Sequence, residues 1–144
     1  MKISSNRIRI IFAEIIYLFL IAFFCYTAFN KMVNISSFRN NLMKTSLFSE
    51  EIANILSVIV IILEILIVLI LLFNKKIGLL LFCGTMLIFT LYISYLRSNG
   101  LYEVCGCGGI LNGLSYNFHL LINVFLILGS ILSYYISNLV NNEK

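Results

Sequence analysis

Two cysteines separated by a single glycine, Cys105-Gly106-Cys107, have the clearest capacity for chemistry in this sequence. A disulfide requires its two Cα atoms to lie about 4.4–6.8 Å apart, and cysteines two positions apart reach that geometry only on a bent backbone. Gly106 allows the bend, because glycine has no Cβ to restrict the backbone. A disulfide in so small a ring is strained, and strained, accessible disulfides exchange readily with other dithiols. We therefore predict that Cys105 and Cys107 form a redox-active pair.

Two structural alternatives exist for the same pair of cysteines. A disulfide there could be a static clip, although closing so short a loop removes little entropy from the unfolded chain. The pair could also supply part of a zinc site, for which His119 is a third candidate ligand. A closed zinc site needs four ligands, so we expect no metal here.

His119 lies at the start of the last apolar segment, a loop's length after Cys107. An imidazole in that place could accept a thiol proton or stabilise a thiolate. The alternative is a histidine at the membrane interface that hydrogen-bonds a carbonyl group. His119 is therefore a candidate catalytic residue beside the two cysteines.

The two cysteines are expected to differ in reactivity. Gly108 and Gly109 follow Cys107, and their backbone N–H groups can turn toward its sulfur as an anion-binding nest. Glu103 lies two positions before Cys105, where its negative charge disfavours a thiolate. We predict that Cys107 is the more reactive thiol.

The composition is that of a membrane protein. Hydrophobic residues make up 61% of the 144 residues and charged residues only 11%. Soluble domains are roughly 45–50% apolar and about 25% charged. Soluble enzymes and nucleic-acid-binding proteins are therefore excluded, and four cysteines are too few for a disulfide scaffold.

The chain contains apolar runs long enough for a helix to cross a hydrocarbon core of about 30 Å. They cover about residues 10–29, 52–73, 77–96 and 118–139, and none shows the two-residue alternation of a barrel strand. The first run exceeds the roughly 7–15 apolar residues of a signal peptide, so we expect it to be retained. The predicted fold is an all-α membrane protein, a single domain built as a bundle of four transmembrane helices.

Lysine and arginine residues predict the orientation of this bundle. If the N-terminus is cytoplasmic, the short inner segments hold Lys2, Arg7, Arg9, Lys75, Lys76 and Lys144. The longer segments 30–51 and 97–117 then lie outside at a lower density of positive charge, as the positive-inside rule requires. We expect both termini to be cytoplasmic and the Cys-Gly-Cys segment to be extracytoplasmic. The net charge of +4 then needs no nucleic-acid partner.

Two carboxylates, Glu14 and Glu64, lie within the apolar runs. An ionised carboxylate near the middle of a membrane costs at least roughly 2.5–3.5 kcal/mol, so such residues are functional candidates. Glu64 lies near the middle of its run. We expect it to be either a protonated or hydrogen-bonded proton relay or a structural partner of Asn123, Thr85 or a tyrosine. Glu14 lies closer to the inner end, from which it can reach the headgroups.

Helical spacing predicts two further features. Residues 35–43 have the pattern of a short helix lying on the membrane as a cap, with an apolar face made of Ile35, Phe38, Leu42 and Met43. The last apolar run carries a stripe of mostly small or polar residues suited to helix packing. The members of this stripe are His119, Asn123, Leu126, Ser130, Ser133 and Ser137. His119 is therefore expected to point inward.

A set of residues along the chain carries a resemblance to a known family. The set comprises Tyr26-x-x-Phe29-x-Lys31, Phe38, Leu63-Glu64, Phe89-Thr90-x-Tyr92, Cys105-Gly106-Cys107-x-Gly109 and Asn123. In this respect the chain resembles the MauE family of methylamine-utilisation membrane proteins, within the wider DoxX-like group of four-helix, redox-associated proteins. The resemblance covers about residues 21–128, and the Cys-Gly-Cys pattern after a span ending in Phe-Thr-x-Tyr is its most specific part.

The resemblance implies a four-span bundle in the bacterial cytoplasmic membrane, with the Cys-Gly-Cys segment facing the periplasm and a thioredoxin-fold partner there. In methylamine users the family is associated with maturation of the disulfide-rich small subunit of methylamine dehydrogenase. This sequence differs from the family pattern in having Gly108 where phenylalanine is usual and in lacking the prolines of the first outer segment.

Three functions are compatible with these residues. The favoured one is a thiol–disulfide redox protein that passes electrons between a periplasmic thioredoxin-like partner and either a quinone or another acceptor in the membrane. The alternative is a non-catalytic assembly factor that docks a periplasmic partner. A transporter using Glu64 is disfavoured, because transporters usually contain broken helices and the chain has no proline.

Overall fold

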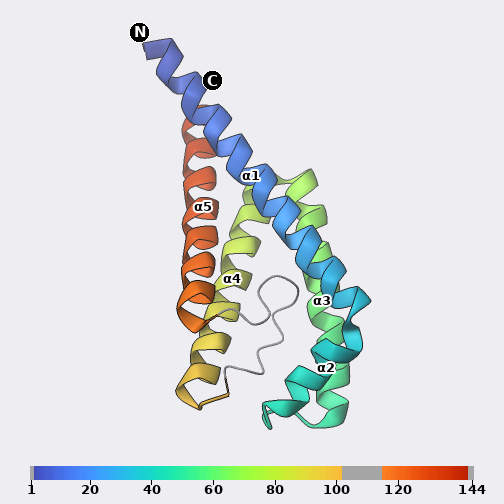
Figure 1. Ribbon diagram of the computed structural model, residues 1–144. Coiled ribbons are helices and arrows are strands. Elements are labelled where there is room, and N and C mark those ends of the chain that lie inside the picture. The colour runs from blue at the N-terminus through green and yellow to red at the C-terminus, as the bar shows by residue number, and fades with distance from the viewer. Residues whose placement is uncertain (1, 102–114, 143–144) are drawn as a thin grey trace.

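The computed structural model describes residues 2–101 and 115–142, and Cys105 and Cys107 lie outside the described residues. The described chain is helical, without strands. Its helices are α1 (Lys2–Val33), α2 (Ile35–Lys44), α3 (Glu50–Phe73), α4 (Lys75–Ser98) and α5 (Tyr116–Asn142), shown in Figure 1. The chain is therefore all-α, as the composition predicts.

Four of these helices are long and apolar enough to cross a membrane. Their apolar segments are Arg7–Val33, Glu50–Phe73, Lys75–Ser98 and Tyr116–Leu139, so each helix extends a few residues beyond the predicted run. The two ends of the chain lie at the same end of the bundle, and α2 lies at the opposite end (Figure 1). The chain is therefore a multi-pass membrane protein.

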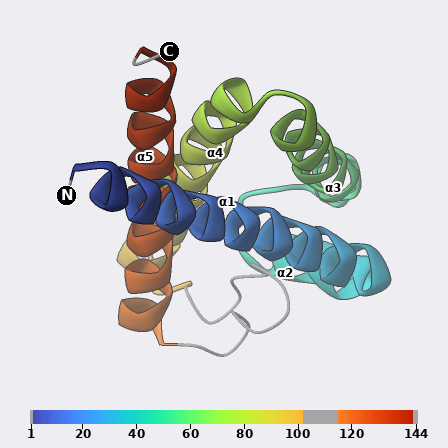
Figure 2. The same cartoon turned by 90° about the horizontal axis from the view of Figure 1, so that it is seen from above.

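The four long helices form a closed ring. Helix α1 packs against α3 and α5, α3 packs against α4, and α4 packs against α5. Viewed from above, the helices surround a common centre, with α1 crossing the bundle obliquely (Figure 2). A cavity lined by residues of all five helices lies within this ring toward α2, and it forms the candidate site.

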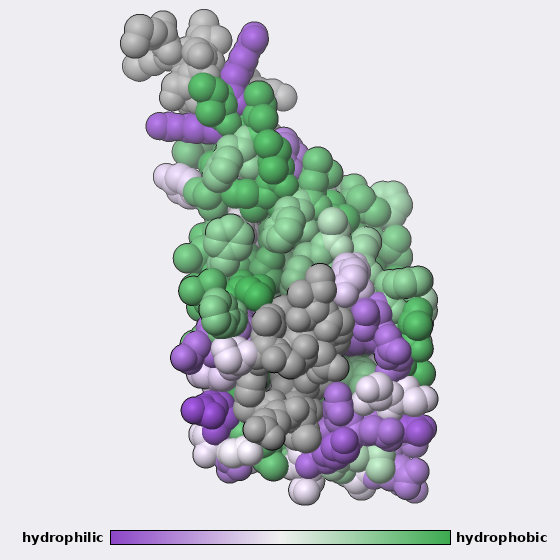
Figure 3. Space-filling model, in the orientation of Figure 1, coloured by the Kyte–Doolittle hydropathy of each residue, from purple (hydrophilic) through white to green (hydrophobic). Residues whose placement is uncertain are grey.

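The outer surface of the bundle is mostly hydrophobic. On the face drawn in Figure 3, hydrophobic residues cover the middle of the molecule and hydrophilic residues gather toward its two ends. Large side chains of the candidate spans, such as Ile88, Leu91 and Phe125, are exposed. A surface of this kind is stable in contact with lipid acyl chains rather than with water.

Aromatic and aliphatic side chains fill the half of the bundle that is nearer the turn between α3 and α4. Phe24 of α1 and Phe82 of α4 are buried, with ring centroids 4.2 Å apart. They belong to a cluster that includes Leu20, Leu71 and Leu79. Close packing of this kind holds α1 and α4 on either side of the central space.

Helices α3 and α4 are joined by a very short turn at Asn74, whose side-chain Oδ1 accepts a hydrogen bond from the Ile77 backbone N–H at 3.2 Å. Gly78 follows on α4, where its backbone lies against Leu71. A Cβ atom added at Gly78 would lie only 2.5 Å from the Leu71 Cα atom. Glycine is therefore required for α3 and α4 to approach so closely.

The end of α4 is a Schellman motif. Gly100 has a φ angle of 72°, and its N–H donates to the Arg97 carbonyl at 3.2 Å. The Leu101 N–H donates to the Leu96 carbonyl at 2.8 Å, and the Leu101 side chain packs against Ile93 and Leu96. This is the hydrogen-bond pattern that ends a helix at a left-handed glycine. It sets the point at which the chain leaves α4 toward Cys105.

Helix α2 forms where a short amphipathic helix is predicted, and part of its predicted apolar face packs on the bundle. Phe38 and Leu42 are buried against Ala53 of α3, and Leu56 and Tyr92 pack around them. Met43 is partly buried in the same cluster, whereas Ile35 is exposed.

Candidate functional site

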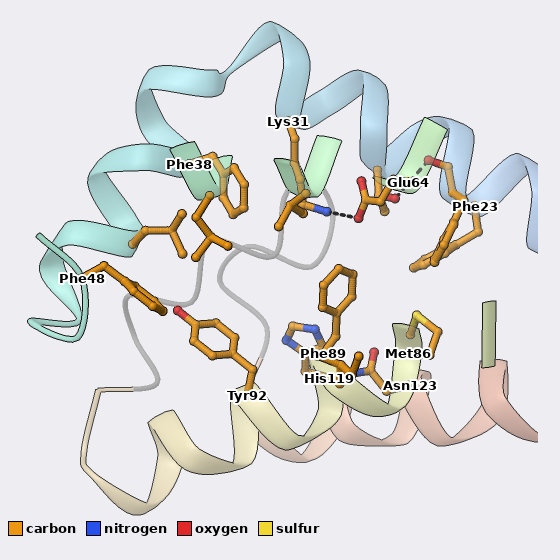
Figure 4. A pocket seen from close by; sticks show the side chains of 16 residues that line it. Phe23, Lys31, Phe38, Phe48, Glu64, Met86, Phe89, Tyr92, His119 and Asn123 are labelled. Carbon is orange, nitrogen blue, oxygen red and sulfur yellow. Dashed lines mark hydrogen bonds and ion pairs between the residues drawn. The ribbon is translucent and has the colours of Figure 1, made fainter. Parts of the chain in front are cut away.

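A cavity of about 190 Å³ lies in the centre of the bundle at its α2 end (Figure 4). Side chains from all five helices contribute to its walls, which are mostly apolar and aromatic. The lining residues are Phe23, Phe24, Thr27, Lys31, Phe38, Leu42, Phe48, Leu56, Val60, Glu64, Met86, Ile88, Phe89, Tyr92, His119 and Asn123. Six of them carry polar side-chain groups: Lys31, Glu64, His119, Asn123, Thr27 and Tyr92. The Thr27 hydroxyl already donates to the Phe24 carbonyl at 3.1 Å. Lys31, Glu64, His119 and Asn123 carry the charged, imidazole and amide groups that could act on a bound molecule.

Lys31 of α1 and Glu64 of α3 form a buried ion pair in the cavity wall. The Lys31 Nζ atom donates to Glu64 Oε1, and the exposed fractions of the two residues are 4% and 0%. Removing two charges from water costs several kcal/mol per ion, which only close pairing and further hydrogen bonds can offset. The stability of the fold alone therefore does not explain why an ion pair lies at this position.

The ammonium group of Lys31 also lies between two aromatic rings. Its Nζ atom is 5.4 Å from the ring centroid of Phe89 and 5.8 Å from that of Phe38. These are cation–π distances, which stabilise the charged lysine in the absence of water. Glu64 Oε2, by contrast, is buried without a hydrogen-bond partner among the residues that the structure describes.

The partner of Glu64 differs from those expected from the sequence. Asn123, Thr85 or a tyrosine was the expected hydrogen-bonding residue, whereas the observed donor is Lys31. The Asn123 amide instead donates to Thr90 Oγ1 at 3.2 Å. The sequence does not predict that Lys31 pairs with Glu64, because the apolar run ends at residue 29. Helix α1 continues to Val33, so Lys31 is part of the helix and lies inside the bundle.

The inward-facing stripe of α5 is confirmed for its first five members. His119, Asn123, Leu126, Ser130 and Ser133 are all buried, whereas Ser137, the last member, is only partly buried. His119 is only 2% exposed and lines the cavity one turn after the start of α5. The structure therefore brings two of the predicted site residues, Glu64 and His119, to the walls of one cavity.

Glu14 has a protein partner, and its side chain remains half exposed. Its Oε1 accepts a hydrogen bond from Lys75 Nζ, and the Lys75 ammonium lies 4.5 Å above the ring of Tyr17. Both charged side chains remain partly accessible. This pair ties α1 to the start of α4 at the end of the bundle away from the cavity.

The other two cysteines lie on the helices. Cys25 of α1 is exposed and Cys83 of α4 is partly buried, and neither forms a disulfide. Within residues 2–101 and 115–142 no group of three potential metal ligands occurs. The chemistry that the described residues offer is therefore that of the Lys31–Glu64 pair, His119 and Asn123.

These features define the chain as a polytopic α-helical membrane protein with a polar pair enclosed in an apolar cavity. A family model described as methylamine utilisation protein MauE matches residues 9–136, which is most of the chain. The chain belongs to the MauE family of membrane proteins tied to methylamine utilisation. Neither the comparison with curated proteins nor that with solved structures gives a match.

Proposed function

We propose that this protein is a membrane thiol–disulfide oxidoreductase that exchanges electrons with an extracytoplasmic thioredoxin-like protein through Cys105 and Cys107. The chemistry of the Cys-Gly-Cys sequence supports this proposal, because two cysteines separated by one residue are suited to exchange rather than to structural clipping. Maturation of an extracytoplasmic protein that contains disulfides is the process that this exchange serves.

The observation that carries the proposal is the location of His119. The segment with the two cysteines leaves the described structure at Leu101 and rejoins it at Ser115, and the His119 N–H donates to the Ser115 carbonyl at 3.1 Å. The buried imidazole therefore lies one helical turn from the point where that segment re-enters the bundle. A histidine so placed can accept the proton of a thiol as it becomes a nucleophile.

The exchange runs through a mixed disulfide. The thiolate of one cysteine attacks a sulfur of the partner's disulfide, a new S–S bond forms between the proteins, and the partner's second sulfur leaves as a thiolate. The second cysteine of the pair then attacks the mixed disulfide and releases the reduced partner. Two electrons pass from the pair to the partner in this direction, and the reverse sequence oxidises the partner.

Single cysteine variants test this proposal. Cys105→Ser keeps Cys107, the predicted attacking thiol, and should accumulate a mixed disulfide with the partner that reducing agent releases. Cys25→Ser and Cys83→Ser are matched controls on the helices and should leave the partner's redox state unchanged. A non-catalytic assembly factor would tolerate loss of both Cys105 and Cys107, and full partner oxidation in that double variant would rule out the redox function.

A further inference from the structure

The cavity contains polar groups that its own side chains do not satisfy. A lysine ammonium carries three N–H donors, and Lys31 directs one of them to Glu64. Glu64 Oε2 is buried, and the described part of the chain provides no donor for it. Leaving a buried acceptor without a donor costs about 1–3 kcal/mol, and more when the acceptor is charged. A molecule that donates to Glu64 while accepting from Lys31 would remove this cost.

The walls restrict the rest of that molecule. Phe38 and Phe89 present aromatic rings to the polar pair, and Tyr92 lies farther along the cavity beside Phe48 (Figure 4). A cavity of about 190 Å³ can hold a single substituted six-membered ring, since an engineered apolar cavity of about 150 Å³ binds benzene. A cationic ligand is disfavoured, because the Lys31 ammonium already lies between Phe38 and Phe89. The site therefore suits a neutral, flat ring with oxygen substituents.

The cavity also reaches the outer surface of the bundle. Ile88 of α4 lines the cavity, although its side chain is 65% exposed on the lipid-facing surface. An apolar tail attached to the bound ring can leave the bundle there and enter the acyl chains. A lipid-soluble ligand with a polar ring and a hydrophobic tail matches both the interior and this exit.

From these observations we infer that the cavity binds the ring of a membrane quinone, with one ring oxygen against Lys31 and Glu64. In the oxidised form a ring carbonyl accepts a hydrogen bond from Lys31 Nζ. In the reduced form the corresponding hydroxyl donates to Glu64 Oε2, for which residues 2–101 and 115–142 provide no donor. The same pair of residues thus accommodates both redox forms.

This inference rests on the proposed function, because the cysteine pair supplies the electrons. Cys105 and Cys107 lose two electrons and two protons as their thiols form a disulfide, and the quinone takes up both electrons and both protons to become a quinol. Because the quinone is reduced, electrons flow from the thioredoxin-like partner through the cysteine pair and into the membrane. One quinone is consumed for each disulfide formed.

Photolabelling of the full chain in lipid nanodiscs tests the binding site. The probe is a decyl azidoquinone, competed with decylubiquinone, and labelled peptides are identified by mass spectrometry. We expect labelling within α1, α3 or α4 around Lys31, Glu64 and Phe89, lowered about tenfold by an excess of competitor. Labelling that decylubiquinone does not compete, or labelling confined to peptides outside the cavity, would overturn the inference.

A matched pair of substitutions controls for non-specific labelling. Phe89→Trp places extra volume in the cavity and should reduce competed labelling about tenfold. Phe125→Trp adds the same volume on an exposed site of α5 and should leave labelling unchanged. Because Phe89→Trp could disturb folding, Lys31→Met/Glu64→Leu serves as a second variant that removes the polar pair without adding volume. Competed labelling at the wild-type level in both cavity variants would rule out the site.

The cysteine variant distinguishes this inference from the proposed function. The chain with both Cys105→Ser and Cys107→Ser should still bind the probe but should not reduce decylubiquinone. The reduced wild-type protein should convert one decylubiquinone for each pair of thiols oxidised. If the wild-type protein exchanges disulfides with its partner but shows no competed labelling, the quinone inference fails and the redox function stands. If the double cysteine variant still oxidises the partner, the redox function fails whatever the labelling shows.

Discussion

Lys31 of α1 and Glu64 of α3 meet through a hydrogen-bonded ion pair that is buried at the centre of the bundle. The two residues are 33 positions apart in sequence, and the contact joins α1 to α3 at the level where α2 closes the end of the ring. Each charge is acceptable in this apolar environment because the other neutralises it. The stability of the fold and the chemistry of the cavity therefore depend on the same pair.

Replacing one member of this pair should destabilise the protein much more than replacing both. Glu64→Leu leaves the Lys31 ammonium buried without a counter-charge and should destabilise the protein by about 3–5 kcal/mol. Glu64→Gln keeps a hydrogen-bond acceptor for Lys31 and should retain the fold. The double variant Lys31→Met/Glu64→Leu removes both charges and should recover most of the stability lost in Glu64→Leu. Unfolding in denaturing detergent, followed by circular dichroism, measures the series; equal stability of Glu64→Leu and Glu64→Gln would show that the pair does not hold α1 to α3.

The contact between α3 and α4 predicts a different effect for two glycines of the same helix. Gly78→Ala places a Cβ atom 2.5 Å from the Leu71 backbone, so it must separate the helices and should cost about 1–3 kcal/mol. A Cβ at Gly84 meets nothing within 4 Å. Gly84→Ala should therefore be neutral or stabilising by up to about 1 kcal/mol, the helix-propensity difference. The same unfolding assay compares the two, and an equal effect of both substitutions would contradict the close helix contact.

The sequence predicts the spans well because membrane insertion depends on local composition. Long apolar runs and the stripe of α5 require no knowledge of the tertiary structure, and the buried positions of His119 and Asn123 follow from spacing alone. The Lys31–Glu64 pair could not be found in this way. Hydropathy places Lys31 just outside the membrane, whereas the extra turn of α1 and the α2 helix folded over it bring Lys31 inside.

The sequence contains one signal from which the Lys31–Glu64 ion pair could have been predicted. Phe38 and Phe89 enclose the Lys31 ammonium, although they belong to α2 and α4 and are far apart in sequence. A lysine near the end of an apolar helix, together with a carboxylate near the middle of the next span, suggests an ion pair that helix length can accommodate. Which lysine pairs with Glu64 depends on how all five helices pack together. The presence of a cavity beside the pair depends on the same packing.

Accessibility labelling in cells tests the predicted orientation. A membrane-impermeant maleimide applied to intact, pre-reduced cells should modify Cys105 or Cys107, because the distribution of lysine and arginine predicts that this segment is extracytoplasmic. A variant lacking Cys25 and Cys83 removes any signal from the helices. Modification that occurs only after lysis would reverse the orientation of the bundle.

The two thiols of the proposed redox pair should react at different rates. Cys107 is followed by Gly108 and Gly109, whose N–H groups can stabilise its thiolate, whereas Glu103 lies near Cys105 and disfavours a negative sulfur. We expect Cys107 to alkylate faster than Cys105 when each is the remaining cysteine of the pair, measured as rates of iodoacetamide reaction across a pH series. Replacing Glu103 with glutamine should speed Cys105 toward the rate of Cys107 by removing the repulsion. If the alkylation rate of Cys105 rises at lower pH than that of Cys107, Cys105 has the more stabilised thiolate and the assignment of Cys107 as the attacking thiol is wrong. A higher plateau rate for Cys105 without that shift in pH would instead show that access from outside the bilayer sets the order of attack.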